Sequence, residues 1–202
     1  MATTTNYGWT TPDDTALVKD GASAIRSLGS AIDSTVYSKL GLVHINTTSF
    51  SAVSSQSISD VFSTTYDNYK ILISGIGSTG NTISFRMRVS GTDDSSSTYN
   101  AQNMGAADTS VGGGRFSNNA TSAYLAHFDT AYNSYSYDFF APFLARATTF
   151  VGGGADDGMA TNASTSRFII GGHNTATSYT GLSLLVNTGT ITGSISIYGY
   201  KK

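Results

Sequence analysis

The segment TISFRMRVSG, residues 82–91, alternates apolar and polar side chains along its whole length. Its apolar members share one face of an extended strand: Ile83, Phe85, Met87 and Val89. Its polar members share the opposite face: Ser84, Arg86, Arg88 and Ser90. A period of two is typical of a strand with one buried face and one face in water. The segment therefore predicts an antiparallel sheet with an apolar inner face.

Similar segments recur from residue 41 to the end of the chain. GSISIYGY (193–200) alternates, whereas YKILISGI (69–76) and LSLLV (182–186) are more continuously apolar, as inner strands of a sandwich are. Five further segments are predicted as strands: 41–47, 121–128, 135–143, 147–151 and 167–171. Clusters of Gly, Ser, Asn and Asp separate them and supply turns. Eight or more short strands without intervening helices predict a mainly β fold, an antiparallel β-sandwich and most simply a jelly roll.

The two longest connections between these predicted strands cover residues 91–119 and 152–166. They carry most of two glycine runs, VGGGRF at 111–116 and VGGGADDG at 151–158. Neither run has the Lys-Ser/Thr pair of a phosphate-binding loop, and neither opens a recognisable helix. Both are therefore predicted to be flexible loops, where variable binding function is expected.

The composition narrows the class of protein. Only 12% of the 202 residues are charged, the formal net charge is -2, and the 11 Lys and Arg residues are scattered singly. Without a basic patch to neutralise phosphates, nucleic-acid binding is not expected. The chain has no cysteine, so disulfides and thiolate chemistry are absent. No secretory signal and no membrane-spanning apolar run is found, so we expect a soluble protein made in a cytoplasm.

The first 40 residues follow a different pattern and hold the only Trp of the chain. TTPDD (10–14) predicts a helix start, because Thr11 can cap, Pro12 fits the first helical position, and Asp13 and Asp14 favour the positive end of the helix dipole. A second start is predicted at Asp20, which can cap, with the following glycine breaking the first short turn. The predicted divisions are an attachment segment (1–19), a helix (20–40) and a β-sandwich (41–202).

The predicted helix carries a narrow apolar stripe formed by Ile25, Leu28, Ile32 and Val36. Leu40 extends this stripe, and Gly41 ends it as a C-cap. Such a helix is roughly 30 Å long at 1.5 Å per residue, and alone in water it is marginally stable. Two partners are considered: the β-sandwich of the same chain, or sister helices in a short parallel bundle, most simply of three.

No catalytic or metal-binding constellation is found. His44, His127 and His173 stand far apart, with no carboxylate or second histidine at ligand spacing. Two acidic pairs, Asp93-Asp94 and Asp156-Asp157, lie in predicted turns and lack the spacing of a calcium loop, so acidic loop tips are the favoured interpretation. All 13 acidic residues are Asp, and no nucleophile elbow occurs. We therefore expect no enzyme activity and no cofactor.

Tyrosines gather in AYLAHFDTAYNSYSYDFF, residues 123–140. A tyrosine ring offers a flat apolar face and a hydroxyl, which suits both protein interfaces and sugar binding. The favoured interpretation places these residues in the core or a subunit interface, and a sugar site comes second: Tyr124, Tyr132, Tyr135 and Tyr137.

The leader TTTNYGWTTPDDTALVKDGASAIRSLGSAID (3–33) closely resembles an N-terminal segment of virion proteins of tailed bacteriophages. In that family YGWTTPDDT, a VKDGA step and an IR-LG--ID helix precede diverse β-rich domains, often in tail-fibre or minor tail proteins. Four later stretches look more weakly like the small jelly rolls of phage fibres: YDNYKILISGI (66–76), FRMRVSG (85–91), STYN (97–100) and TGTITGSISIYGYKK (188–202).

This resemblance implies a homotrimeric structural protein of the virion, in which the leader and the sandwich have different roles. The leader docks into another virion protein, and the sandwich faces a host-surface glycan or protein. The implied attachment residues are Tyr7, Trp9, Pro12, Asp13, Asp14, Lys19, Asp20 and Arg26. Tyr7 and Trp9 are expected to be exposed and to fill another protein's groove, while the charged residues fix register.

The expected function is adhesion by a trimeric tail-fibre or receptor-binding component, without membrane insertion. One alternative is a head-fibre or capsid decoration protein. A second alternative, from another class, is a depolymerase acting on surface polysaccharide.

Overall fold

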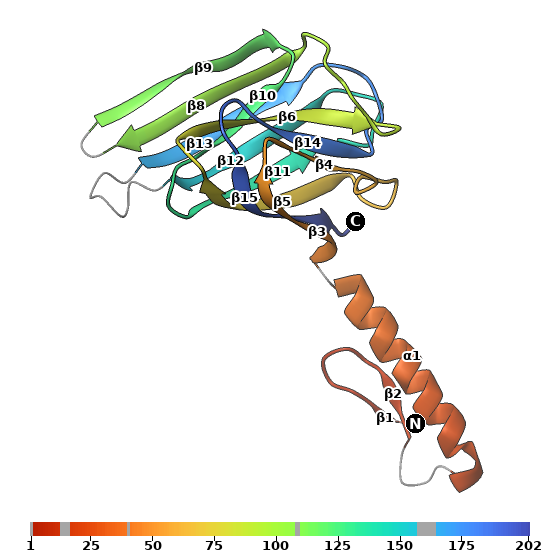
Figure 1. Ribbon diagram of the computed structural model, residues 1–202. Helices are drawn as coiled ribbons and strands as arrows, with labels where there is room; N and C mark the ends of the chain where they lie inside the picture. Colours follow the sequence, from red (N-terminus) through yellow and green to blue (C-terminus); the bar gives the residue numbers. More distant parts are fainter. Residues whose placement is uncertain (1, 13–16, 40, 108–109, 157–164) are drawn as a thin grey trace. The chain divides into compact units, whose positions relative to one another are not determined.

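The computed structural model describes residues 2–12, 17–39, 41–107, 110–156 and 165–202. The chain forms two compact units, Met1–Gly41 and Leu42–Tyr200 (Figure 1). The first unit contains a short hairpin and a helix, and the second is built of antiparallel strands.

The first unit begins with a two-stranded hairpin. β1 (Ala2–Thr3) pairs antiparallel with β2 (Thr10–Thr11). The backbone N–H of Thr4 continues the pairing by donating to the carbonyl of Trp9 at 2.9 Å. Gly8 has a φ of 66° in the turn, a conformation that glycine adopts without steric cost.

The helix of the first unit starts later than the first predicted signal. A 3₁₀ turn, η1 (Val18–Asp20), leads directly into α1 (Gly21–Lys39). The predicted start at Thr11 is wrong, because this residue lies in β2 and pairs with Ala2 in an extended conformation. The second predicted start lies close to the observed one, but Asp20 is the last residue of the 3₁₀ turn rather than a cap, and Gly21 is the first residue of α1 rather than a break. Leu40 lies outside the described residues.

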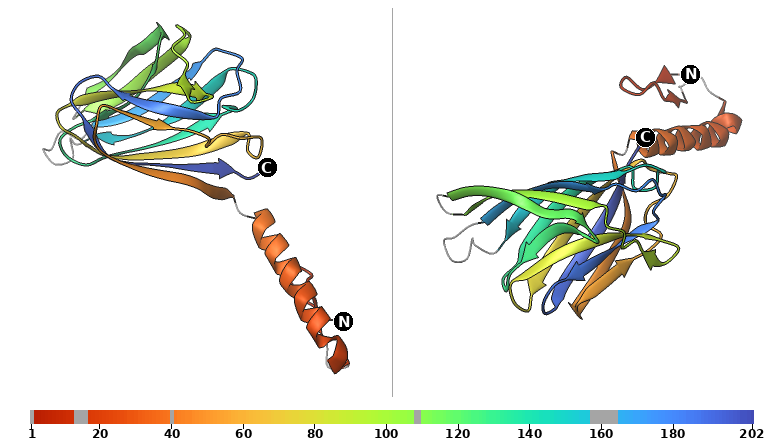
Figure 2. Two further views of the ribbon diagram at one scale, coloured as in Figure 1. Left: turned by 45° about the vertical axis from the view of Figure 1, so that its right-hand side comes forward. Right: turned by 90° about the horizontal axis from the view of Figure 1, so that it is seen from above.

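The second unit is a sandwich of two antiparallel sheets, seen as two layers in Figures 1 and 2. The larger sheet has the order β3-β15-β5-β11-β12-β13-β8-β9, and the smaller has the order β10-β6-β14-β4 with β7 beside β6. The strands are β3 (Leu42–Val53), β4 (Ser55–Ile58), β5 (Asn68–Gly77), β6 (Asn81–Val89), β7 (Thr92–Asp93), β8 (Tyr99–Ala107), β9 (Ser110–Ala120), β10 (Ala123–Phe128), β11 (Asn133–Phe140), β12 (Thr148–Asp156), β13 (Thr165–His173), β14 (Gly181–Val186) and β15 (Ile191–Tyr200).

Eight of these strands have the order of a jelly roll. The eight strands are those of the second unit that remain when β7, β8, β9, β12 and β13 are set aside, and they are numbered here from first to eighth along the chain. In the larger sheet the order β3-β15-β5-β11 is then first, eighth, third and sixth. In the smaller sheet the order β4-β14-β6-β10 is second, seventh, fourth and fifth. This interleaving of two four-stranded sheets is the jelly-roll topology, so the predicted fold class is confirmed.

The core lies between the two layers and is rich in aromatic rings. The alternation predicted for residues 82–91 is confirmed, because Ile83, Phe85 and Met87 are buried on β6. The ring centroid of Phe85 lies 5.1 Å from those of Phe139 and Phe150 on the facing sheet. These edge-on contacts join the two layers and add to the free energy of burial.

The first predicted long loop, residues 91–119, is largely strand, because it holds β8 and all but the last residue of β9, so that part of the prediction is wrong. In the second, residues 152–166, the described residues 152–156 and 165–166 are strand as well and belong to β12 and β13. As two hairpins they extend the larger sheet beyond β11 in the order β12-β13-β8-β9. The jelly roll thus gains a wide four-stranded extension on one side.

Glycines in this extension make room for aromatic rings. Gly152 and Gly154 on β12 pair with Tyr137 and Tyr135 on β11. A Cβ atom on Gly152 would lie 2.7 Å from the Tyr137 ring, and one on Gly154 would lie 2.8 Å from the Tyr135 ring. The glycine run therefore reflects close packing in a strand rather than a flexible loop.

Candidate functional site

The aromatic residues of the predicted attachment segment stack on each other. The rings of Tyr7 and Trp9 lie 5.0 Å apart with an interplanar angle of 13°. Tyr7 is 58% exposed, as expected for an attachment residue. Trp9 departs from the expectation of an exposed ring: it is half-buried, and its Nε1 donates a hydrogen bond to Thr35 Oγ1 on α1 at 3.0 Å. Since an indole N–H needs an acceptor once it leaves water, α1 itself supplies one.

The other predicted attachment residues are distributed over this unit. Pro12 and Asp20 line one hollow of about 460 Å³ between the hairpin and the start of the helix. Lys19 and Arg26 are exposed and do not line that hollow. Asp13 and Asp14 lie outside the described residues.

The four residues of the predicted seam of α1 differ in exposure. Ile25 is 66% exposed, Ile32 36% and Val36 53%. Their spacing of seven and four residues places them in one stripe along the helix. Leu28 is half-buried and lies two turns before Thr35, on the face that receives Trp9. Three of the four seam residues are therefore left in water by their own chain.

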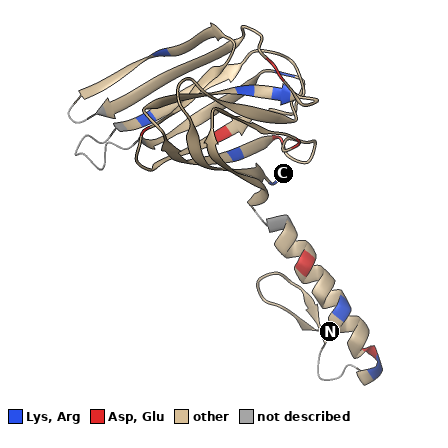
Figure 3. Ribbon diagram, in the orientation of Figure 1, with Lys and Arg blue, Asp and Glu red and all other residues tan. Residues whose placement is uncertain are grey.

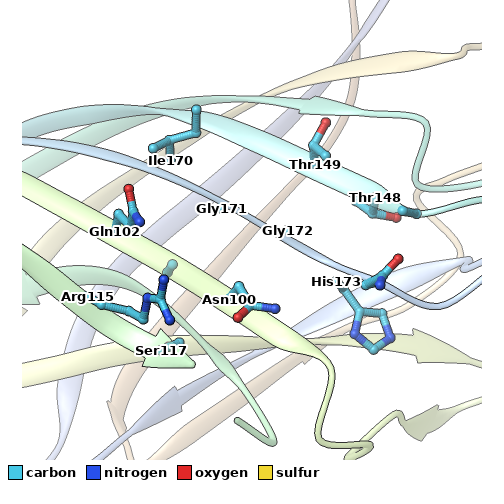
Figure 4. A pocket seen from close by; sticks show the side chains of 13 residues that line it. Asn100, Gln102, Arg115, Ser117, Thr148, Thr149, Ile170, Gly171, Gly172 and His173 are labelled. Atoms are coloured by element: carbon cyan, nitrogen blue, oxygen red, sulfur yellow. The ribbon is translucent and has the colours of Figure 1, made fainter. Parts of the chain in front are cut away.

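A second candidate surface lies on the outward face of the sheet extension. The strand register forms one row of neighbours in the order Val151, Ile170, Gln102 and Arg115. The next row places Gly172 between Thr149 and Asn100. Because Gly172 has no side chain, the sheet surface is hollowed there. A groove of about 540 Å³ results, called the Gly172 groove (Figure 4).

The Gly172 groove is continuous with an apolar ledge. An adjoining hollow of about 640 Å³ shares Gln102, Arg115 and Ile170 with the groove and adds Met104 and Phe168. The ledge is defined by its three large apolar side chains, which are 57%, 48% and 50% exposed: Met104, Phe168 and Ile170. Polar and apolar contacts are thus available side by side, which is typical of ligand sites.

Charge is sparse on the sandwich (Figure 3). Among the described residues that line the groove and the ledge, Arg115 is the one side chain with a full positive charge, and no Asp lines either hollow. Arg115 Nη1 donates to Asn118 Oδ1 at 3.0 Å. Figure 4 shows the guanidinium turned towards Asn100 and Gln102 on β8.

At one end of the groove, His173 belongs to a buried polar network that was not expected from the sequence. Its Nε2 lies 3.1 Å from Asp94 Oδ2 and 2.6 Å from the Tyr179 hydroxyl, and its Nδ1 lies 3.0 Å from Thr98 Oγ1. The Tyr99 ring stacks on the imidazole with centroids 3.9 Å apart. Asp94 and His173 are 79 residues apart, so no local motif could reveal the pair.

The environment of this network fixes its protonation. Burial lowers the pKa of His173, and its hydrogen bond and charge interaction with Asp94 offset only part of that effect. Partial burial raises the pKa of Asp94, but hydrogen bonds from Tyr179, Ser96 and His173 outweigh it and hold the pKa well below its ordinary 3.8. The imidazole of His173 is therefore neutral and the carboxylate of Asp94 ionised near neutral pH. Because the ring is 1% exposed, the network holds strands and turns together rather than presenting a reactive group.

The remaining candidates have structural positions. His44 and His127 lie on β3 and β10, and no group of three His or Asp residues that could hold a metal occurs within the described part of the chain. Asp93 pairs with Arg88, so this acidic pair is not a free loop tip. Tyr124, Tyr135 and Tyr137 are buried in the core, as the favoured interpretation predicts, while Tyr132 is 70% exposed. Asp157 lies outside the described residues, and the structure describes only the backbone of Asp156.

None of the helices in the described ranges has the length and apolarity needed to span a membrane.

Comparison with known proteins adds no assignment. No protein-family model matches the chain, and no curated protein matches it.

Proposed function

We propose that the chain is a virion structural protein of a tailed bacteriophage, acting in adhesion as a trimeric tail-fibre or receptor-binding component. The N-terminal unit joins the particle, and the jelly roll contacts a host-surface glycan. The proposal rests above all on the stripe formed by Ile25, Ile32 and Val36, which their own chain leaves exposed.

The stripe favours self-association of α1. A helix of 19 residues with one thin apolar face is marginal alone in water. Full burial of an exposed Ile or Val side chain contributes about 1.5–3 kcal/mol; these three residues are 36–66% exposed, so each gains part of that free energy when three helices associate. A narrow seam suits a parallel bundle of sister helices.

The hairpin supports a docking role for the leader. Tyr7 stacks on Trp9 and keeps more than half of its surface in water, so its ring is available to the groove of another protein. The resemblance of residues 3–33 to virion leaders supplies the partner class. Host binding by the jelly roll then gains strength from three copies in each fibre and many fibres on each particle.

Deletion of residues Met1–Asp20 tests the attachment role. We expect the shortened chain to keep the thermal unfolding transition of the jelly roll, because the two units are compact separately. We also expect it to be missing from purified particles, whereas the full chain is incorporated. Incorporation of the shortened chain at the normal level would contradict the proposal.

Two measurements separate this proposal from its alternatives. Immunogold labelling of particles is expected to mark the tail, whereas a label on the capsid would favour a head-fibre or decoration protein. Purified protein is expected to bind host polysaccharide without releasing reducing ends. Release of reducing ends would favour a depolymerase.

A further inference from the structure

We propose that the Gly172 groove binds an acidic saccharide, with the ligand carboxylate on Arg115, its hydroxyl groups on Gln102, and its C–H face on Ile170. This inference rests on the proposed adhesion function and names the ligand class and the contact residues.

The groove is built into the sheet rather than formed by a loose loop. Gly172 lies on β13 between β12 and β8. A Cβ atom on Gly172 would lie 2.6 Å from the carbonyl oxygen of Thr148. Close approach of the strands therefore requires glycine here, and the same missing side chain leaves room for a ligand over the sheet.

The charge in the groove selects an anionic group. The row of outward-facing residues that contains Arg115 also contains Asp138, but Asp138 is already 3.2 Å from Lys70 Nζ on the neighbouring strand. No described carboxylate forms an ion pair with Arg115. The charge of Arg115 is therefore available to an anionic group of a ligand.

Arg115 is oriented for recognition of a carboxylate. Its hydrogen bond to Asn118 Oδ1 uses Nη1 and limits rotation of the guanidinium. The other N–H groups are left for a planar carboxylate, which a guanidinium binds with paired hydrogen bonds. A single cation does not suit a polyphosphate, which needs several.

Gln102 and Ile170 complete a site for a sugar ring. Gln102 stands directly opposite Arg115 on β8, and Ile170 stands opposite Gln102 on β13. The exposed side-chain amide of Gln102 makes no hydrogen bond to the described residues, so its donor and acceptor are both available to hydroxyl groups. Ile170 and Phe168, half exposed on the ledge, offer apolar surface to the C–H face of a sugar. A carboxylate, a hydroxyl group and an apolar face can thus be contacted at adjacent strand positions.

Calorimetric titration of the full chain tests this site. The probes are oligomers of galacturonate, glucuronate and sialic acid, each used beside its carboxyl-reduced counterpart of the same length. We expect at least one acidic oligomer to bind and its reduced counterpart to bind about tenfold or more weakly, since a charge-assisted pair is lost. Absence of binding by all three acidic oligomers, or equal binding of the reduced forms, would overturn the proposal.

Four variants locate the interaction. R115Q is expected to weaken binding of the acidic oligomer by about tenfold to a hundredfold, and R115K is expected to weaken it less. Q102A is expected to weaken binding severalfold for the acidic and the reduced oligomers alike. The charge-matched control R86Q alters the smaller sheet, where Arg86 bonds Thr121, and is expected to bind normally. Normal binding by R115Q would refute the assignment.

If R115Q particles carry the protein normally but adsorb poorly, both proposals stand. If the protein is incorporated but Arg115 is irrelevant to acidic saccharides, only this inference fails.

Discussion

Trp9 Nε1 donates a hydrogen bond to Thr35 Oγ1 at 3.0 Å, across 26 residues of sequence. This bond joins the N-terminal hairpin to α1 and gives the leader a folded form within a single chain. The leader is therefore a small preorganised element with Tyr7 at its surface rather than an extended tail. Preorganisation lowers the conformational entropy that docking must overcome.

Removal of the Thr35 acceptor should loosen the hairpin. Thr35→Val keeps the side-chain shape but leaves the Trp9 N–H without this partner, at a cost of about 1 kcal/mol. Because Trp9 is the only Trp in the chain, its fluorescence reports on the hairpin directly. We expect a red shift of the emission maximum in the variant and no shift in Ser34→Ala on the exposed side of α1. An unchanged spectrum of Thr35→Val would contradict a role for this bond.

Charges in the exposed stripe of α1 should abolish trimers. Ile25→Asp together with Ile32→Asp places carboxylates where sister helices would bury apolar side chains, which is strongly unfavourable. We expect sedimentation to show monomers for this variant and trimers for the parent chain. Ser30→Asp with Ser34→Asp adds the same charge on the opposite side of the helix and should leave trimers intact. An unchanged mass of the first variant would mean that the stripe packs elsewhere.

The jelly roll should lose stability in mild acid. The pKa of buried His173 is below its ordinary 6.5, so the unfolded chain takes up a proton first as the pH falls. Stability is then full above about pH 6.5 and declines below it. The pKa of Asp94 is also lowered, which removes further stability below its ordinary 3.8.

Thermal unfolding between pH 7 and pH 5 measures the His173 contribution. We expect the Tm to fall over this range in the parent chain. His173→Gln should have a lower Tm at pH 7, since the network is broken, but a flatter dependence on pH. His44→Gln alters an exposed histidine and should keep the parent slope. A steep slope in His173→Gln would assign the acid sensitivity to another group.

A methyl group on Gly152 should destabilise the sandwich. Its Cβ would lie 2.1 Å from the carbonyl oxygen of Ser136 and against the Tyr137 ring. We expect Gly152→Ala to lower the free energy of unfolding in urea by about 1–3 kcal/mol, the usual cost of overpacking. Gly112→Ala, where the Cβ meets nothing within 4 Å, should be nearly neutral. Equal free energies of unfolding for the two variants would instead favour the flexible loop that the sequence predicts for the glycine run at 151–158.

Which faces of the strands and of α1 are apolar could be predicted from the sequence alone. The period of two in residues 82–91 predicts the buried row that contains Phe85, and the three-and-four spacing after Asp20 predicts α1. Both patterns follow from the geometry of one strand or one helix. The count of such strands was enough to predict the jelly roll.

The roles of the glycine runs and of the scattered polar residues follow from contacts between strands that are distant in the sequence. Gly152 lies in a strand because the Tyr137 ring of another strand covers it, and Asp94 meets His173 only through the fold. The place of Arg115 beside Gln102 depends on the register of β8 and β9. These relationships join residues on different strands, and the hydrophobic period along one strand does not specify the strand beside it.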